Sequence, residues 1–320
     1  MSENNVSTDI FVTVDLGGTL VRAAAYTRAG EQIVRVESDS PAAGDSNQLV
    51  AAITDAVRKV WRENILAVGL GAPGPLNPQA GIILQAPNLP GLDNFPLAQE
   101  LKAIFGCPVY LGNDANLAAL AEWRFGAGRD HADLLYLTVS TGIGGGVIIG
   151  GRLLTGNAGL AAELGHVSVM EGGPLCGCGQ HGHLEAVAAG PAIARLAREH
   201  ISAGAKSQII ELVDGDDNEI TAAHVGQAAK SDDQLALEVL ATAGRAIGRA
   251  LAGFAHSFNP GVIILGGGVI GAGEAILRPI RATFERELII PEYHCPVVTA
   301  ALDRDVGLLG ALVLATENTL

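Results

Sequence analysis

The sequence has few aromatic residues and no long apolar run, and each shortage excludes certain classes of protein. Aromatic residues make up only 4% of 320 residues, although 48% are apolar and 42 are glycine, so the cores must be largely aliphatic. No apolar stretch reaches the ~20 residues that a membrane-spanning helix needs. The polar N-terminus, residues 1–10, has neither the basic nor the apolar region of a signal peptide. We therefore expect a cytoplasmic globular protein with no membrane partner.

Positive charge is also scarce. There are 20 Lys and Arg residues against 34 Asp and Glu residues, which gives a net charge of −14. Such a chain repels nucleic acid, which is therefore not expected as a partner. An anionic ligand such as ATP would need local backbone N–H groups or a metal ion, so glycine-rich turns deserve the closest inspection.

Cysteine is rare, and its distribution is uneven. In a reducing compartment a disulfide framework is not expected, and clustered cysteines indicate metal or redox chemistry. Cys176 and Cys178 are such a cluster, whereas Cys107 and Cys295 lie in apolar strand-like contexts and are predicted to be core residues.

Strand and helix patterns alternate along the chain, which predicts an α/β fold. A strand, a glycine turn and a second strand are predicted at residues 9–27, and the same pattern returns at 134–150. This recurrence predicts two lobes of related design, with a boundary near 115–130. Further strands are predicted at 32–38, 65–74, 107–114 and 259–268, and helices at 46–60, 97–105, 116–125, 191–200, 234–256 and 307–317.

Three glycine-rich turns are candidates for nucleotide binding. Asp15-Leu-Gly17-Gly18-Thr19 and Ser140-Thr141-Gly142-Ile-Gly-Gly-Gly each follow a strand, and their backbone N–H groups and hydroxyls suit phosphate. Asp15 could hold Mg²⁺. Gly266-Gly267-Gly268 follows another strand and leaves room for a flat adenine. Each turn, taken alone, is also compatible with an ordinary hairpin or loop.

A further polar group ends the strand at 107–114. Asp114 has no Lys or Arg near it in the sequence, so its carboxylate could serve as a catalytic base. It could equally be the N-cap of the helix that follows. The residues alone leave both interpretations open.

The segment from His166 to His183 carries a candidate metal site. Two thiolates and two imidazoles suit tetrahedral Zn²⁺, and the glycines around Cys176 and Cys178 allow a short loop to fold round one ion. We predict His166, Cys176, Cys178 and His183 as the ligands. His181 is the alternative to His183, and incidental or redox-active cysteines are the alternative to a metal site.

Together these elements resemble the ROK family (repressors, open reading frames, kinases). The resemblance spans the chain from Asp15 to the final helix, and its most specific part is Glu163-x-Gly-His166 followed by C-G-C-G-x-x-G-x-x-Glu185. It implies a two-lobed actin-like ATPase (ribonuclease H-like) fold. Residues 1–115 would form a small lobe to which the last helix, about 307–320, returns, and 116–306 a large lobe with a zinc-binding loop at 163–185.

The resemblance also implies roles for residues. Asp114 would be the catalytic base. The sugar would be held by Gly74, Asn88, Asn113, Asp114, Glu163, His166 and Glu185. The nucleotide would be held by Asp15, Gly17, Gly18, Thr19, Thr141, Gly142, Gly266 and Gly267. The implied cofactors are ATP, Mg²⁺ and Zn²⁺, and the implied assembly is a homodimer or homotetramer.

Two positions depart from the family pattern. His183 stands where most members have a third zinc-binding Cys, so a Cys₂His₂ site is expected in place of Cys₃His. Leu20 stands where many members carry Lys, so the nucleotide either lacks one cationic contact or receives it elsewhere.

The resemblance implies an ATP-dependent hexose kinase, with glucose as the first choice. N-acetylmannosamine, fructose and allose remain alternative substrates, and polyphosphate an alternative donor. A non-catalytic sugar-sensing regulator is a second alternative, which the presence of both Asp15 and Asp114 disfavours. A repressor is disfavoured because only 14 residues precede Asp15 and the chain is acidic.

Overall fold

The computed structural model describes residues 9–41, 46–84 and 93–319. Its contacts divide the chain into two α/β units. The first comprises Met1–Asp130, Leu153–Ala161 and Ala301–Leu320, and the second His131–Arg152 and Ala162–Ala300. The boundary expected between residues 115 and 116 falls inside a helix that the contacts assign to the first unit.

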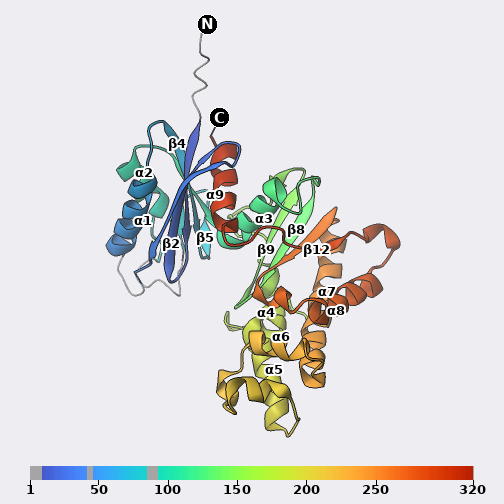
Figure 1. The fold of residues 1–320 in the computed structure, drawn as a ribbon. Helices are drawn as coiled ribbons and strands as arrows, with labels where there is room; N and C mark the ends of the chain where they lie inside the picture. Colours follow the sequence, from blue (N-terminus) through green and yellow to red (C-terminus); the bar gives the residue numbers. More distant parts are fainter. Residues whose placement is uncertain (1–8, 42–45, 85–92, 320) are drawn as a thin grey trace. The chain divides into compact units, whose positions relative to one another are not determined.

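The first unit is built on a five-stranded sheet of order β3-β2-β1-β4-β7 (Figure 1). Its antiparallel half consists of β1 (Ile10–Leu16), β2 (Leu20–Thr27) and β3 (Gln32–Asp39). Its parallel half extends from β1 through β4 (Ile65–Ala72) to β7 (Val109–Asn113). The carboxyl ends of β1, β4 and β7 therefore meet at one edge, where ligands of α/β sheets bind.

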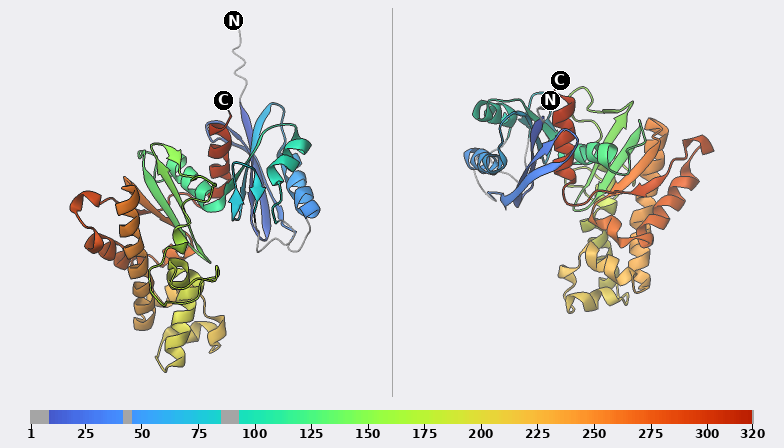
Figure 2. Two further views of the ribbon diagram at one scale, coloured as in Figure 1. Left: turned by 180° about the vertical axis from the view of Figure 1, so that it is seen from behind. Right: turned by 45° about the horizontal axis from the view of Figure 1, so that its top comes forward.

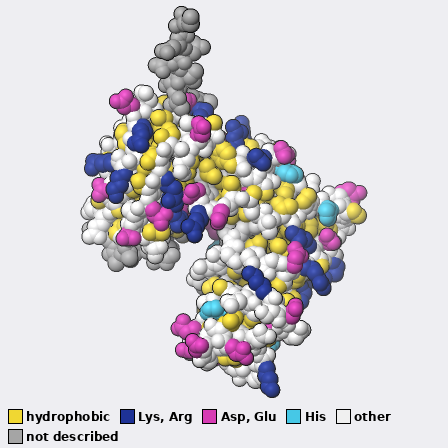
Figure 3. Space-filling model, in the orientation of Figure 1, with side chains coloured by type: hydrophobic (Ala, Val, Ile, Leu, Met, Phe, Trp, Pro, Cys, Tyr) yellow, Lys and Arg dark blue, Asp and Glu magenta, His cyan; other side chains and the backbone are white. Residues whose placement is uncertain are grey.

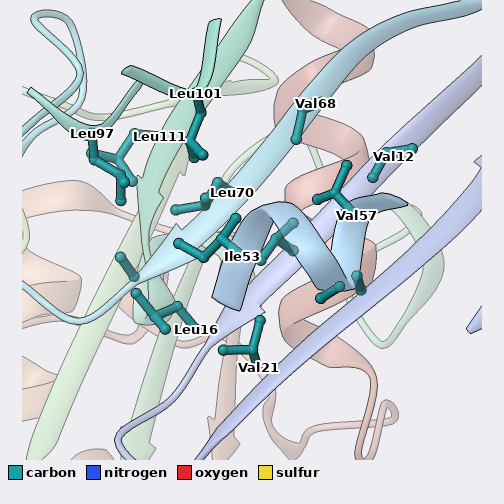
Figure 4. Close-up of a cluster of buried hydrophobic side chains, with 14 of the residues drawn as sticks. Val12, Leu16, Val21, Ile53, Val57, Val68, Leu70, Leu97, Leu101 and Leu111 are labelled. Carbon is teal, nitrogen blue, oxygen red and sulfur yellow. The ribbon is translucent and has the colours of Figure 1, made fainter. Parts of the chain in front are cut away.

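Helices α1 (Ser46–Val60) and α2 (Leu97–Phe105) cover one face of this sheet. Figure 4 shows their apolar side chains packed on those of the strands. Alternate strand residues point to this face, so the core is a layer of aliphatic side chains. It includes Val12, Val21, Ile53, Val57, Val68, Leu70, Leu97, Leu101 and Leu111.

The opposite face is covered by α9 (Val306–Glu317), which lies beside the first sheet in both views of Figure 2. Phe11 and Tyr26 pack there against Leu308 and Leu312. The last helix of the chain thus belongs to the first unit. Helix α3 (Asp114–Phe125) packs on α9, and a short hairpin of β5 (Leu76–Asn77) and β6 (Ile82–Ile83) follows β4.

The second unit repeats the strand arrangement of the first. Its sheet has the order β10-β9-β8-β11-β12, with β8 antiparallel to β9 and parallel to β11. The strands are β8 (Leu134–Val139), β9 (Ile143–Ile149), β10 (Arg152–Leu153), β11 (Val262–Gly266) and β12 (Val297–Thr299). The related design predicted from the two strand–glycine–strand patterns is confirmed.

Five helices accompany the second sheet in the described part of the chain. They are α4 (Leu184–Ala188), α5 (Gly190–Ser202), α6 (Ala222–Ala229), α7 (Gln234–Phe258) and α8 (Glu274–Glu287). The sequence analysis did not predict α4, α6, α8 or β12. Pro279 lies inside α8, where proline ordinarily argues against a helix.

Within residues 9–41, 46–84 and 93–319, no helix combines the length and hydrophobicity needed to cross a bilayer. On the face that Figure 3 shows, Lys and Arg side chains are interspersed with Asp and Glu. This mixture of charges does not favour nucleic acid binding at that face.

Candidate active site

The first glycine turn connects β1 to β2. The Gly17 N–H donates to the Leu20 carbonyl over 2.9 Å, which closes a tight hairpin with Gly18 and Thr19 exposed at its tip. The Gly17 N–H is thus bonded within the turn, and the exposed groups of the turn belong to Gly18 and Thr19.

Asp15 stands at the start of this turn and has a cationic neighbour. Arg22 lies opposite it on β2, and its Nη1 donates to Asp15 Oδ2 over 3.0 Å. Burial raises the pKa of Asp15 above its ordinary value, and the Arg22 pair only partly offsets this effect. A Cβ at Gly307 would lie 2.8 Å from the Asp15 carboxyl carbon, so a larger residue at this position would clash with the carboxylate.

The sequence analysis missed Arg22, although its position was readable. In a hairpin with a short glycine turn, residues equally distant from the turn face each other across the strands. Arg22 supplies a cation two residues beyond Leu20, the position where many family members carry Lys.

Asn113 and Asp114 join β7 to α3, and the structure separates their roles. Asn113 is the N-cap of α3, because its Oδ1 accepts from Ala115 N over 2.9 Å and from Asn116 N over 3.4 Å. The N-cap interpretation of Asp114 is therefore wrong. The Asp114 side chain is exposed, and its Oδ1 accepts from Ala115 N over 2.7 Å.

Asp114 keeps a carboxylate that is not paired with a cation. No Lys or Arg among residues 9–41, 46–84 and 93–319 forms an ion pair with it. The protein packed around it raises its pKa above the ordinary value, the Ala115 N–H lowers it, and the charge of Asp15 raises it further. A carboxylate with a raised pKa and no cation is a stronger proton acceptor than an ordinary aspartate.

The loop after β4 lies against Asn113. A Cβ at Gly74 would be 2.9 Å from Asn113 Nδ2, so only glycine allows this close approach without displacement. Asn88 and the stretch Ala86–Gly91 lie outside the described residues. The first unit thus places Asp15, Gly74, Asn113 and Asp114 at the ends of three neighbouring parallel strands.

In the second unit, the four predicted zinc ligands come together. His166 Nδ1 lies 3.7 Å from Cys176 Sγ, and His183 Nδ1 lies 3.2 Å from Cys178 Sγ. One ligand atom from each of the four side chains lies within 4.8 Å of the others. Tetrahedral zinc with these donors would place ligand atoms roughly 3.3–3.8 Å apart, so the set fits one ion with a small contraction.

His181 is not part of this cluster. Its Nδ1 lies 3.0 Å from the Gly173 carbonyl oxygen, and its side chain is exposed. The geometry therefore favours His183 as the fourth ligand. Cys295 is buried and Cys107 packs at the margin of the first core, as their apolar contexts predicted.

Glu185, on α4, links the metal cluster to the second glycine turn. Its Oε2 accepts from the Ile143 N–H over 2.9 Å, and Cys176 Sγ lies 3.8 Å from its Oε1. A Cβ at Gly142 would lie 2.6 Å from Glu185 Oε2, so the absence of a side chain at Gly142 allows the carboxylate to approach the turn. One carboxylate thus connects a predicted zinc ligand with a predicted phosphate turn.

A cavity of about 490 Å³ opens beside this turn. Thr141 lines it from the second glycine turn, Gly268 and Val269 line it from the segment after β11, and Arg198 lines it from α5. The glycines before Gly268 have a packing role that the sequence analysis did not foresee. A Cβ at Gly266 would collide with the Tyr136 hydroxyl, and one at Gly267, where φ is +90°, with the Val139 carbonyl.

The remaining predicted sugar residues lie around a short 3₁₀ turn, Leu164–His166. Glu163 precedes this turn and is exposed, whereas His166 is half-buried and directs Nδ1 to the cysteines.

Two units of the same strand order, each with a glycine turn after its first strand, define an actin-like ATPase fold. The ROK family model matches residues 11–318, and the chain belongs to the ROK family. It is 38% identical over 310 residues to a glucokinase from Thermotoga maritima, covering 96% of this chain and 97% of that protein.

Two further relatives bear on the substrate. A crystal structure of a ROK family glucokinase from Streptomyces griseus in complex with glucose and AMPPNP is 37% identical, with a TM-score of 0.81, covering 97% of this chain and 100% of that one. An N-acetylmannosamine kinase from Salmonella heidelberg is 33% identical over 310 residues, covering 97% of this chain and 99% of that protein.

Proposed function

We propose that the protein is an ATP-dependent hexose kinase, and specifically a glucokinase that converts glucose and ATP to glucose 6-phosphate and ADP. The observation that carries the proposal is the Asp114 carboxylate at the end of β7, which has a raised pKa and forms no ion pair with a Lys or Arg of the described residues. The similarity to the glucokinases of Thermotoga maritima and Streptomyces griseus over nearly the whole chain supports glucose as the acceptor.

In the proposed reaction, Asp114 accepts the proton of a sugar hydroxyl. The hydroxyl oxygen forms a bond to the γ-phosphorus of ATP, and the bond from that phosphorus to the bridging oxygen breaks, which releases ADP. General base assistance of this kind contributes roughly 10²–10⁴-fold. The remaining acceleration comes from positioning and charge stabilisation.

The nucleotide would be held by both glycine turns. Gly18 and Thr19 offer exposed groups to the phosphates, and Thr141 faces the cavity proposed for the adenosine. Mg²⁺, when bound, would neutralise phosphate charge, and Asp15 is the carboxylate suited to hold it directly or through water. The remaining nucleotide contacts proposed are Gly17, Gly142, Gly266 and Gly267.

The sugar hydroxyls would be held by residues of both units. Asn113 uses its Oδ1 as the α3 cap, so its Nδ2 is the group left to donate to the sugar. The other proposed contacts are Gly74, Asn88, Glu163, His166 and Glu185. Zn²⁺, when bound by His166, Cys176, Cys178 and His183, would fix the loop that carries the proposed sugar contacts His166 and Glu185.

The similarity to an N-acetylmannosamine kinase keeps that sugar as the second candidate substrate. Discrimination between epimers depends on the placement of single hydroxyl partners. We further propose a cytoplasmic homodimer or homotetramer, as the family resemblance implies.

The decisive assay measures ADP release from ATP with glucose, N-acetylmannosamine, fructose and allose, and repeats the series with polyphosphate as the donor. We expect the highest kcat/KM with glucose and ATP. Turnover with N-acetylmannosamine alone would reassign the substrate. Binding of a sugar without turnover of any of them would indicate a sensing module and contradict the kinase.

A further inference from the structure

Glu122, near the end of α3, is a buried carboxylate that the proposed reaction does not use. Its relative exposure is 0%. Its Oε1 accepts from the Leu302 N–H over 2.7 Å, and its Oε2 accepts from Ala127 over 2.8 Å and from Ala301 over 3.2 Å. Three backbone N–H groups from two distant segments thus meet on one side chain.

The two segments adjoin two of the four points where the chain crosses between the units. The chain leaves the first unit after Asp130, re-enters it for Leu153–Ala161, and finally returns to it at Ala301. The Ala127 amide lies three residues before the first of these crossings, and the Ala301 and Leu302 amides are the first two after the last. Glu122 therefore fixes two of the points where the chain departs from the first unit.

An ordinary packing role accounts poorly for a carboxylate at this position. Burial of a charge is costly, and a negative charge near a helix C-terminus is disfavoured by the helix dipole. Among the described residues, no Lys or Arg forms an ion pair with Glu122, and backbone amides alone compensate its charge.

The surrounding backbone is shaped for this carboxylate. A Cβ at Gly126 would collide with Glu122 Oε2, and the Gly128 N–H donates to the Glu122 carbonyl over 2.9 Å. The segment at 126–128 thus turns back on Glu122 through both its side chain and its main chain.

Helix α3 also begins with Asp114, the proposed base. The helix is one rigid element of twelve residues, so the base and the two connections are fixed to the same body. A connection that loosened at Ala127 or Ala301 would lose its fixed relation to Asp114.

We propose that Glu122 is a positioning residue for phosphoryl transfer, which holds these two connections on α3 so that the units close on a hexose about residues 129–133 and 300. This inference rests on the proposed kinase function. Closure of such a hinge excludes water and brings together groups from both units. A looser hinge raises the entropic cost of reaching the closed state and admits water to the phosphate.

Glu122→Gln is the direct test, because it keeps the size of the side chain but turns one acceptor into a donor that faces an N–H group. We expect about a tenfold higher KM for glucose with a smaller change in kcat, and a severalfold higher ratio of ATP hydrolysed to glucose phosphorylated. Small-angle scattering should show a smaller glucose-induced decrease in radius of gyration than in the wild type.

Two controls separate positioning from stability. Leu101→Ala opens a cavity in the core under α2 and lowers stability without touching the connections. Glu100→Gln removes one exposed charge from the same unit. Wild-type kinetics for Glu122→Gln below its melting temperature, or the same KM shift in Leu101→Ala, would overturn the proposal.

Hydrogen exchange in the wild-type protein tests the hinge even if Glu122→Gln does not fold. Glucose should change hydrogen exchange at residues 129–133 and leave the Ala127, Ala301 and Leu302 amides unchanged. Equal changes at both sets of amides would contradict the hinge location. A wild type that phosphorylates hexose with no change in scattering refutes the hinge alone. A wild type that closes on glucose but transfers no phosphate refutes the kinase alone.

Discussion

At the scale of single residues, the environment of Asp114 determines its chemistry. It is exposed enough to meet a substrate, yet the protein packed around it and the charge of Asp15 both favour the protonated form. Its side chain accepts a hydrogen bond from the Ala115 N–H over 2.7 Å. Such a carboxylate is accessible to a substrate and is a stronger base than an ordinary aspartate.

The raised pKa of Asp114 predicts the acid limb of activity. As the pH falls through this raised pKa, Asp114 becomes protonated and can no longer accept the hydroxyl proton. We expect kcat/KM for glucose to decline with an apparent pKa above the ordinary 3.8. A profile of kcat/KM against pH, with folding followed by circular dichroism, checks this. An acid limb at or below 3.8 in folded protein would argue against Asp114 as the base.

Asp233 is predicted to contribute to stability instead of catalysis. Burial alone would raise its pKa, but hydrogen bonds from the Ala236 and Gln208 N–H groups and the Ser207 hydroxyl lower it overall. Asp233→Ala should reduce the free energy of unfolding by about 1–2 kcal/mol at pH 7, because it removes the α7 cap and the anchor of residues 207–208.

The sign of the Asp233 pKa shift fixes the pH dependence. Its contribution is present above the unfolded pKa and is lost as the pH falls through the lower folded pKa. Urea denaturation from pH 7 down to pH 3 should show the difference between wild type and Asp233→Ala shrinking below pH 3.8. Glu238→Gln, an exposed change on the same helix, is the control. A pH-independent difference would refute the assignment.

At the scale of elements, the predicted zinc-binding loop at 163–185 and the second glycine turn are in direct contact. Glu185 joins Cys176 to the Ile143 N–H, and the 3₁₀ turn at Leu164–His166 packs on β9. A Cβ at Gly165 would collide with the Ile143 carbonyl, so this packing is close. A change in the loop should therefore affect the turn proposed to bind the nucleotide as well as the residues proposed to bind the sugar.

Metal removal tests this connection. The wild type should contain about one zinc per chain, and chelation should weaken binding of both glucose and AMPPNP by at least about tenfold, with recovery when zinc is restored. Calorimetry of each ligand and elemental analysis measure this without any turnover. Cys176→Ser should reproduce the effect and Cys107→Ser should not. Full affinity for both ligands in zinc-free protein would refute the scaffold role.

The sequence predicted helices and strands where the spacing of apolar residues was regular. It did not predict elements in which that spacing was interrupted or too short to recognise. Strands β1, β2, β8 and β11 were predictable from apolar runs that end in glycine turns. Helix α8 was hidden by Pro279, and β12 is only three residues long. Short or interrupted elements are specified by packing, which periodicity does not report.

The same division holds for the candidate site. Asp15, Asp114 and the four predicted zinc ligands lie in recognisable local sequence patterns, so the sequence analysis could propose them, and the four predicted ligands do come together in the structure. Arg22 and Glu122 were missed, because their partners become neighbours only after folding. The three groups that donate to Glu122 are backbone N–H groups, and no pattern of side chains in the sequence indicates where they lie.

At the scale of the whole molecule, the proposed machinery is divided between two units of similar topology. Asp15, Asn113 and Asp114 belong to the first unit, and Thr141 and Glu185 belong to the second. The proposed reaction draws on residues of both units, and the proposed positioning role of Glu122 concerns two of the points where the chain crosses between them.

The most direct test of the account compares glucose phosphorylation by wild type and Asp114→Asn under saturating ATP and glucose. Asparagine can still accept the Ala115 N–H but cannot take up the hydroxyl proton. We predict glucose affinity within a few-fold of wild type and a decrease in kcat of about 10²–10⁴-fold. Turnover by Asp114→Asn within a few-fold of wild type would contradict the claim that this carboxylate is the base of a hexose kinase.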